Sequence, residues 1–186
     1  SLGGNCDPGH LAVDLHRVVH AGLADVIAEI DGHGDTGTEA QRQYRQAMRL
    51  ALRAVIAWAE RYADVAEQAA RTSADPLLRA CHARVAAACR RVPAAPARNL
   101  FEGLQAMALV HLALTLEGHG MSVSIGLPDR ILEPFIEPAD DPQETAALIA
   151  AFMLKIAANS VFGRGSKTQA IDRKSTRLNS SHGKLS

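Results

Sequence analysis

The stretch Gly118-His119-Gly120-Met121-Ser122-Val123-Ser124-Ile125-Gly126 interrupts a sequence that is otherwise patterned for helices. Residues 121–125 alternate apolar and polar side chains between glycines. This alternation predicts one short β-strand with Ser122 and Ser124 on the same face. A single strand leaves its backbone donors and acceptors unpaired, so it needs a neighbouring strand. No second strand is evident from the sequence pattern.

On both sides of this strand, apolar residues recur at the three-and-four spacing of amphipathic helices. Thr38 and Gln41 form a capping box at the start of one helix, and Asp75-Pro76 opens another. The predicted helices cover residues 14–31, 38–71 and 76–91, then the segment from Pro96 to Gly118 and a last segment from Pro142 onward. The fold class is therefore mostly α with one clear short strand.

The composition agrees with a helical protein and narrows the classes of function. The 186 residues are 47% apolar but only 4% aromatic, so alanine and other helix-favouring side chains supply most of the apolar content. Twenty basic residues balance twenty acidic ones, which removes the excess positive charge that nucleic-acid binding requires. No apolar run reaches the roughly 20 residues that span a bilayer. We therefore expect a cytoplasmic protein that binds neither nucleic acid nor membrane.

The end of the chain differs abruptly from the rest. Up to Ile171 the sequence is rich in Ala and Arg, whereas residues 172–186 are polar and lack apolar periodicity. The string from Asp172 to His182 resembles one reading frame of a common sequencing-adapter oligonucleotide. We therefore expect residues 172–186 to be a non-native tail and base the functional analysis on residues 1–171.

The residues alone leave several functions open. His16 and His20 lie four residues apart on a predicted helix and could share a metal, although a zinc site needs a third protein ligand and none is evident. The polar strand, followed by Asp129 and Arg130, suits a pocket that binds hydroxyl or carboxylate groups. A metal-dependent helical-bundle enzyme and a non-catalytic helical interaction or regulatory module are the alternatives to such a pocket.

A longer set of motifs, in order along the chain, is more specific than any of these patterns. The central motifs are Pro93-Ala94-Ala95-Pro96, Asn99-Leu100-Phe101-Glu102-Gly103-Leu104-Gln105, His111, and Ser122-Val123-Ser124-Ile125-Gly126 with Asp129-Arg130 and Pro134. The flanking motifs are Gly9-His10 with Asp14, Gly22-Leu23, Trp58-Ala59-Glu60-Arg61-Tyr62-Ala63 and Ser166-Lys167-Thr168-Gln169. Together they resemble the glycyl radical enzymes of the pyruvate formate-lyase-like family, over nearly all of residues 9–171.

The resemblance implies a lyase, dehydratase or decarboxylase that acts on a small polar substrate by thiyl radical chemistry. In this family a ten-stranded barrel wrapped in helices holds a Cys at its centre and receives a radical Gly from a carboxy-terminal loop. Both residues, and the neighbours of the predicted strand, are expected after Ile171. Residues 1–171 would then form a partial pyruvate formate-lyase-like domain, with no catalytic residue, cofactor or metal site of its own and no activity by itself.

The resemblance also implies a substrate-binding pair. In diol-dehydrating relatives the His of the Gly-His motif and the first Ser of the strand contact substrate hydroxyls, and these positions correspond to His10 and Ser122. A polar pair that hydrogen-bonds a hydroxyl discriminates strongly against analogues that lack it. The full-length enzyme is expected to carry a protein glycyl radical, to be activated by a radical-SAM enzyme and to form a homodimer.

Overall fold

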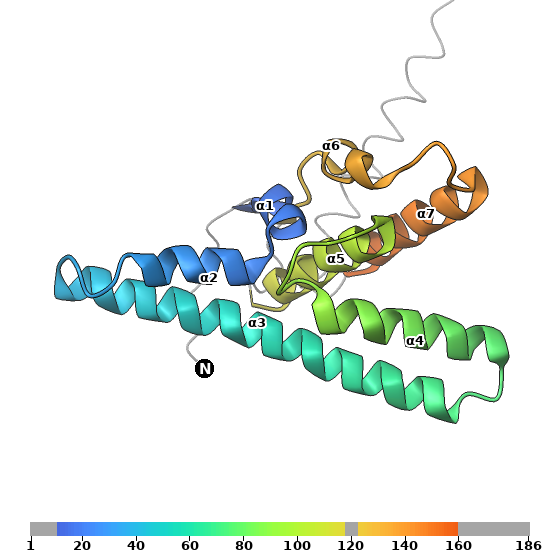
Figure 1. The fold of residues 1–186 in the computed structure, drawn as a ribbon, viewed down its shortest axis with the longest axis horizontal. Helices are drawn as coiled ribbons and strands as arrows, with labels where there is room; N and C mark the ends of the chain where they lie inside the picture. Colours follow the sequence, from blue (N-terminus) through green and yellow to red (C-terminus); the bar gives the residue numbers. More distant parts are fainter. Residues whose placement is uncertain (1–10, 118–122, 160–186) are drawn as a thin grey trace, which may run out of the picture.

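The computed structural model describes residues 11–117 and 123–159, most of which are helical (Figure 1). The helices are α1 (Leu15–His20), α2 (Leu23–Gly32), α3 (Glu39–Thr72), α4 (Pro76–Arg91), α5 (Leu100–Glu117), α6 (Pro128–Leu132), a 3-10 helix (Glu133–Phe135) and α7 (Pro142–Asn159). The strands are β1 (Leu11–Ala12) and β2 (Val123–Ser124). The predicted helices at 38–71 and 76–91, before Gly118 and from Pro142 are confirmed as α3, α4, α5 and α7. Residues 172–186, the expected tail, lie outside the described residues.

The single helix predicted for residues 14–31 is wrong, because the chain breaks into α1 and α2 at Gly22. Gly22 has φ +84° and ψ 163°, a combination that only glycine adopts without strain. The first turn of α2 packs on the segment after α4, where the Leu23 amide donates to the Pro93 carbonyl at 2.8 Å and the Ala24 amide to the Ala94 carbonyl at 3.0 Å. A Cβ on Gly22 would lie 2.4 Å from the Ala94 oxygen. The break therefore results from a tertiary contact.

Helices α3 and α4 form a long antiparallel hairpin, and α2 lies along the first part of α3 (Figure 1). The capping box at the start of α3 is present, with the Gln41 amide donating to the Thr38 hydroxyl and the Thr38 amide to the Gln41 side chain. Small buried side chains of α3, Ala59 and Ala63, cluster with Cys89 in the last turn of α4 and with Leu109 of α5. These small residues let the helices approach closely.

Helix α5 carries the main core. It packs against α1, α4, α6 and α7 and against strand β2. Its buried residues Leu104, Met107 and Val110 share one cluster with residues of the surrounding helices, namely Leu15, Val18, Val19, Ile131, Leu132 and Phe152. None of the described helices is long and apolar enough to cross a membrane. The core is thus built around one helix that is apolar on nearly every side.

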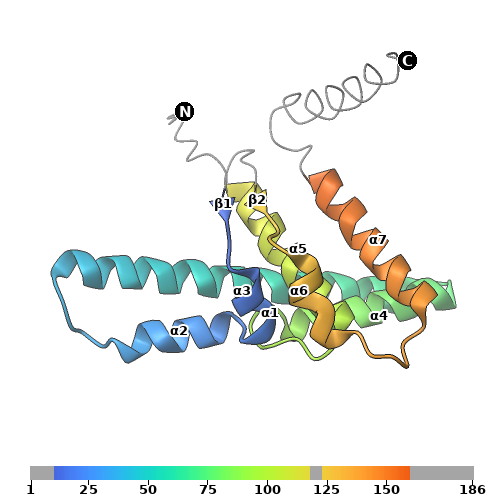
Figure 2. The same cartoon turned by 90° about the horizontal axis from the view of Figure 1, so that it is seen from above.

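The two strands lie side by side and run parallel (Figure 2), with Leu11 opposite Val123 and Ala12 opposite Ser124. The strand predicted for residues 121–125 is confirmed at Val123–Ser124, and residues 118–122 lie outside the described residues. The expectation that its neighbours all lie after Ile171 is wrong, because β1 near the start of the chain is one of them. A two-residue strand is too short to show alternation, so the sequence pattern could not reveal it.

Candidate functional site

The two residues expected to form the polar site come immediately before the two strands in the sequence. His10 and Ser122 directly precede Leu11 of β1 and Val123 of β2, and both lie outside the described residues. Their assignment as substrate-binding residues stays a prediction. The described residues form the scaffold beside them, a parallel pair whose register is set at Leu11 and Val123.

Beyond β2, the chain turns away from the strand pair into α6. Ser124 is exposed, and its hydroxyl accepts a hydrogen bond from the Gly126 amide at 3.2 Å. Gly126 has φ +71°, a left-handed conformation that glycine adopts readily. Asp129 and Arg130, the acid and base expected near the strand, are exposed residues of α6. The turn at Gly126 therefore separates them from β2.

His20 has a structural contact that the metal hypothesis did not anticipate. Its Nε2 lies 2.9 Å from the carbonyl oxygen of Ile131, so the imidazole joins α1 to the end of α6. One face of the ring stacks on Phe135 with centroids 5.2 Å apart, and the His16 ring lies 4.4 Å away. Within residues 11–117 and 123–159, no three His, Cys, Asp or Glu side chains come together as metal ligands. His20 thus helps to fix the helices that follow the two strands.

His111 is a polar residue at the strand end of α5. Its side chain is buried, with 5% of the residue exposed, and α5 packs there against β2. Burial lowers the pKa of His111 below its ordinary value, although the backbone of Val123 acts in the opposite direction. Burial therefore favours the neutral form of the His111 imidazole, at the end of α5 that packs against β2.

Glu102 is a buried carboxylate that two arginines contact. It lies buried in the first turn of α5, where the Arg98 guanidinium donates to both carboxylate oxygens and the Arg98 amide adds a bond of 2.8 Å. Arg91 at the end of α4 lies 3.6 Å away. Burial raises the pKa of Glu102, but the bonds from Arg98 and the charge of Arg91 outweigh burial and hold it below its usual value. This ion pair joins α4 to α5 and has a structural role.

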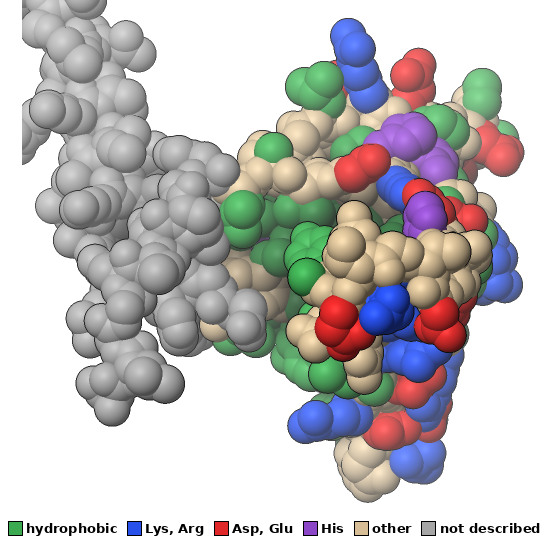
Figure 3. All heavy atoms as spheres, turned by 90° about the vertical axis from the view of Figure 1, so that its left-hand side faces the viewer, with side chains coloured by type: hydrophobic (Ala, Val, Ile, Leu, Met, Phe, Trp, Pro, Cys, Tyr) green, Lys and Arg blue, Asp and Glu red, His purple; other side chains and the backbone are tan. Residues whose placement is uncertain are grey.

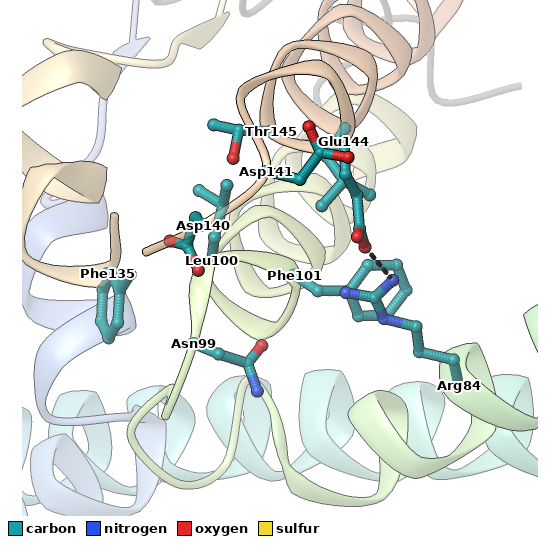
Figure 4. Close-up of a pocket in the computed structure, with 10 residues that line it drawn as sticks. Arg84, Asn99, Leu100, Phe101, Phe135, Asp140, Asp141, Glu144 and Thr145 are labelled. Carbon is teal, nitrogen blue, oxygen red and sulfur yellow. Dashed lines mark hydrogen bonds and ion pairs between the residues drawn. The ribbon is translucent and has the colours of Figure 1, made fainter. Parts of the chain in front are cut away.

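A cavity of about 140 Å³ opens between α4, the first turn of α5 and the start of α7 (Figure 4). The Arg84 guanidinium lies 4.3 Å from the Phe101 ring centroid and 3.0 Å from a Glu144 oxygen, so its charge is already paired. The other carboxylates at this cavity cap backbone amides, as Asp141 does for Gln143 at 2.9 Å. The cavity lies at the opposite end of α5 from His111 and β2, so it is separate from the site expected at the strands.

Charges on the face where α2 meets α3 are mixed. Figure 3, which views this end of the molecule, shows basic and acidic side chains interspersed. Arg17 pairs with both Asp25 and Glu29, and Arg49 lies 2.8 Å from Asp31. Positive charge on this face is therefore neutralised locally.

Comparison with known proteins assigns the chain to a group of enzymes. A family model described as "Pyruvate formate lyase-like" matches residues 3–171. The isethionate sulfite-lyase of Bilophila wadsworthia is 32% identical over 114 residues, which are 61% of this chain and 14% of that enzyme. The glycyl radical subunit of the 4-hydroxyphenylacetate decarboxylase of Clostridium scatologenes is 24% identical over 139 residues, 72% of this chain and 15% of that subunit.

Solved structures show the same arrangement of elements. A glycyl radical enzyme from Archaeoglobus fulgidus matches 82% of this chain with a TM-score of 0.70 and 27% identity, and the match covers 21% of that enzyme. The B12-independent glycerol dehydratase from Clostridium butyricum matches 81% of the chain with a TM-score of 0.68 and 20% identity, over 22% of its own length. The chain therefore spans only about a fifth, or less, of the relatives that it matches.

Proposed function

Because the chain belongs to the pyruvate formate-lyase-like family of glycyl radical enzymes, we propose that it builds one wall of a substrate site in such an enzyme. The enzyme would be a lyase, dehydratase or decarboxylase that acts on a small polar substrate. The relatives named above include a sulfite-lyase, a decarboxylase and a glycerol dehydratase, so the reaction class follows from the family and the substrate does not.

The observation that carries the proposal is the register of the parallel pair. Leu11 lies opposite Val123 and Ala12 opposite Ser124. The same separation along the sequence joins His10 to Ser122, which immediately precede the paired residues. Because parallel strands keep a constant register, the pairing favours a site in which His10 and Ser122 act together.

In this site His10 and Ser122 would each form a hydrogen bond to a substrate hydroxyl or another polar group. Such bonds orient the substrate and reject analogues that leave the two side chains unpaired. The glycyl radical of the family, transferred to a Cys thiol, supplies the hydrogen abstraction that begins the reaction. The described residues would position the two strands and exclude water from one side of the site, since the apolar helix α5 packs against β2.

Glycyl radical enzymes are activated by radical-SAM enzymes and bind small substrates. For the enzyme that includes this chain, we propose the same kind of activating partner, a homodimeric assembly and a cytoplasmic location.

A chimaera tests the proposal. Residues 3–171 would replace the matching segment of the Bilophila wadsworthia isethionate sulfite-lyase, and the chimaera would be treated with that enzyme's activating partner under anaerobic conditions. Electron paramagnetic resonance measures the glycyl radical, and turnover is measured with isethionate, glycerol and 1,2-propanediol. We expect a stable radical and turnover of at least one of these substrates.

Variants of the chimaera then test the site. We expect His10→Ala and Ser122→Ala each to raise KM about tenfold or more while the radical yield is unchanged, because each removes one bond to the substrate. Ser124→Ala is the matched control, since the Ser124 hydroxyl is bound to the Gly126 amide. A chimaera with a full radical signal and unchanged KM in both variants would refute the assignment of His10 and Ser122.

A further inference from the structure

The apolar packing of helix α7 follows one stripe of side chains. Leu148, Phe152 and Ile156 recur every four residues and pack against the cluster that surrounds α5. Phe152 is buried, whereas Leu148 and Ile156 are partly buried. Beyond its first turn, α7 is therefore covered on one side by the described residues.

The opposite side of α7 is exposed and apolar. We call it the outer face of α7, and its exposed residues are Ala146, Ala147, Ala150, Ala151, Met153 and Leu154. After Glu144 in the first turn, Lys155 is the only charged residue of the helix. A surface helix normally places charged and polar side chains opposite its apolar stripe. The outer face lacks the charges of such a surface.

An exposed apolar side chain on the α3–α4 hairpin has different neighbours. Val65 of α3 is 68% exposed, and the adjacent Asp64 forms an ion pair with Arg90 of α4. Arg61 and Gln68 are exposed on either side of Val65 along the helix. Single exposed apolar residues of this kind are normal, whereas a contiguous apolar patch marks an interaction surface. The outer face of α7 is such a patch.

The strand pair is incomplete as well. Among the described residues the sheet consists of β1 and β2, with two residues each. A sheet of this size has little stability of its own, and parallel sheets are normally covered on both faces. The described part of the chain thus leaves two surfaces unfinished, the edges of the strand pair and the outer face of α7.

The lengths of the relatives indicate what covers these surfaces. The isethionate sulfite-lyase is matched over 14% of its length, and the two solved structures over 22% and 21%. Most of each relative therefore lies outside the region that this chain matches. A segment tethered in the same polypeptide meets the outer face at an effective concentration near the millimolar range, whereas a second copy meets it only at the bulk protein concentration.

We propose that the outer face of α7 is an internal interface of the enzyme, covered by an apolar part of the same polypeptide that lies outside the matched region. The small side chains of Ala147 and Ala150 let a neighbouring segment approach the α7 backbone closely, and Leu154 packs among its side chains. The inference rests on membership of the family and not on the assignment of His10 and Ser122.

The first test compares the 186-residue chain with the chimaera described above, in which residues 3–171 are part of a complete enzyme. Leu154→Cys is labelled with N-ethylmaleimide in both proteins before activation, and mass spectrometry of the peptides separates its label from that of the exposed Cys81. Val65→Cys is the matched control, because Val65 and Leu154 are 68% and 73% exposed. We expect similar rates at both sites in the chain and labelling of Leu154→Cys about tenfold slower, or more, in the chimaera.

The second test introduces a charge at the same position. Leu154→Glu should leave the melting temperature of the 186-residue chain unchanged, because the side chain is in water. In the chimaera it would place an unpaired charge in an apolar interface, so we expect the yield of soluble enzyme to fall about tenfold or more. Val65→Glu should change neither protein.

Three results would overturn the proposal. Labelling of Leu154→Cys at the same rate in the chimaera and in the chain would show that the outer face stays open. Protection already present in the chain, together with a dimer that Leu154→Glu dissociates, would make a second copy the occupant. Equal yields of the Leu154→Glu and Val65→Glu chimaeras would show that the outer face is not covered.

A second framework keeps the test independent of one host enzyme. The glycerol dehydratase from Clostridium butyricum, which matches 81% of the chain, can receive the same segment and the same variants. Labelling uses neither a substrate nor the radical. A failure of the His10 and Ser122 assignment would therefore leave the interface standing, and the reverse also holds.

Discussion

Helices α5 and α7 have the same length, 18 residues, and both are apolar on nearly every side, but only α5 is buried. In α5, Leu104 and Met107 are enclosed by the surrounding helices. In α7, Phe152 is the one buried residue among those described, and Met153 and Leu154 are 47% and 73% exposed. A helix that is apolar all round normally belongs inside a protein. The exposed side of α7 is therefore more apolar than an ordinary protein surface, whereas the apolar side chains of α5 are enclosed by the surrounding helices.

The difference agrees with the lengths of the relatives. The chain matches only 14% of the isethionate sulfite-lyase and about a fifth of the solved structures. The first turn of α7 is joined to α4 by the Arg84–Glu144 ion pair, and Figure 2 shows the rest of α7 extending away from the α3–α4 hairpin at one side of α5. Stability should thus be concentrated around α5, and substitutions on the outer face of α7 should have small effects in this chain.

The largest expected effect comes from a pair of methionines, one in each helix. Met107 in α5 is completely buried, and we expect Met107→Ala to lower the free energy of unfolding by about 2–5 kcal/mol. Met153→Ala in α7 should change it by less than about 0.5 kcal/mol, since its side chain is half exposed. Urea unfolding followed by circular dichroism measures both. Equal losses in the two variants would show that α7 is as well packed as α5.

A second variant tests the close contact between Gly22 and the segment that connects α4 to α5. Gly22→Ala should lower the free energy of unfolding by about 2–3 kcal/mol, because the new Cβ would meet the Ala94 backbone and φ at this position is positive. Gly32→Ala at the end of α2 is the matched control, because a Cβ there meets nothing within 4 Å. The control should be neutral or slightly stabilising. A Gly22→Ala chain as stable as the Gly32→Ala chain would show that the contact with the Pro93–Pro96 segment is not tight.

These variants also mark which parts of the fold were open to prediction from the sequence. The start of α3 is set by a local signal, Thr38 with Gln41, and the structure contains both bonds of that box. The break at Gly22 depends on hydrogen bonds to carbonyls about seventy residues later in the sequence. The apolar periodicity continues across Gly22, so it predicted a single helix there. Strand β1 was missed for the same reason, since its partner supplies the only evidence of it. Local signals were therefore sufficient for the long helices and insufficient where distant segments meet.

The same distinction between local signals and distant contacts applies to the candidate site. His16 and His20 have the local spacing of a metal pair, but His20 lies against a carbonyl 111 residues away, which no spacing rule reveals. His111 and Glu102 were visible only within a family motif, and the structural role of Glu102 depends on its contacts with Arg98 and Arg91. His10 and Ser122 came from the resemblance and await the chimaera.

A third prediction compares the acidic residues in the first turns of the two helices. Glu102→Gln in α5 should lower the free energy of unfolding by about 1–2 kcal/mol at pH 7, because Arg98 and Arg91 lose a buried charged partner. Glu144→Gln in α7 breaks an exposed pair with Arg84 and should change it by less than about 0.5 kcal/mol.

The pH dependence gives an independent check on Glu102. Its pKa is lower in the folded chain than the ordinary 4.5, so the ionised form stabilises the fold at all pH values above about 4.5. This contribution is lost as the pH falls through the lowered pKa, when the carboxylate becomes protonated. The unmodified chain and Glu102→Gln should therefore converge in stability at acid pH. A constant difference down to the lowest pH at which both fold would contradict the ion pair.

The smallest expected change in stability is on the outer face of α7, at Leu154. Leu154→Ser should alter the free energy of unfolding by less than about 0.5 kcal/mol, because the side chain is already in water. The same substitution at Leu104 in α5 should destabilise the chain about as much as Met107→Ala does, since it places a hydroxyl in the core and removes buried apolar surface. Binding of the dye ANS, which reports exposed apolar surface, should fall in Leu154→Ser and rise in Leu104→Ser. If Leu154→Ser were instead strongly destabilising, α7 would have to pack in solution on both sides, and the contrast between the two helices would be lost.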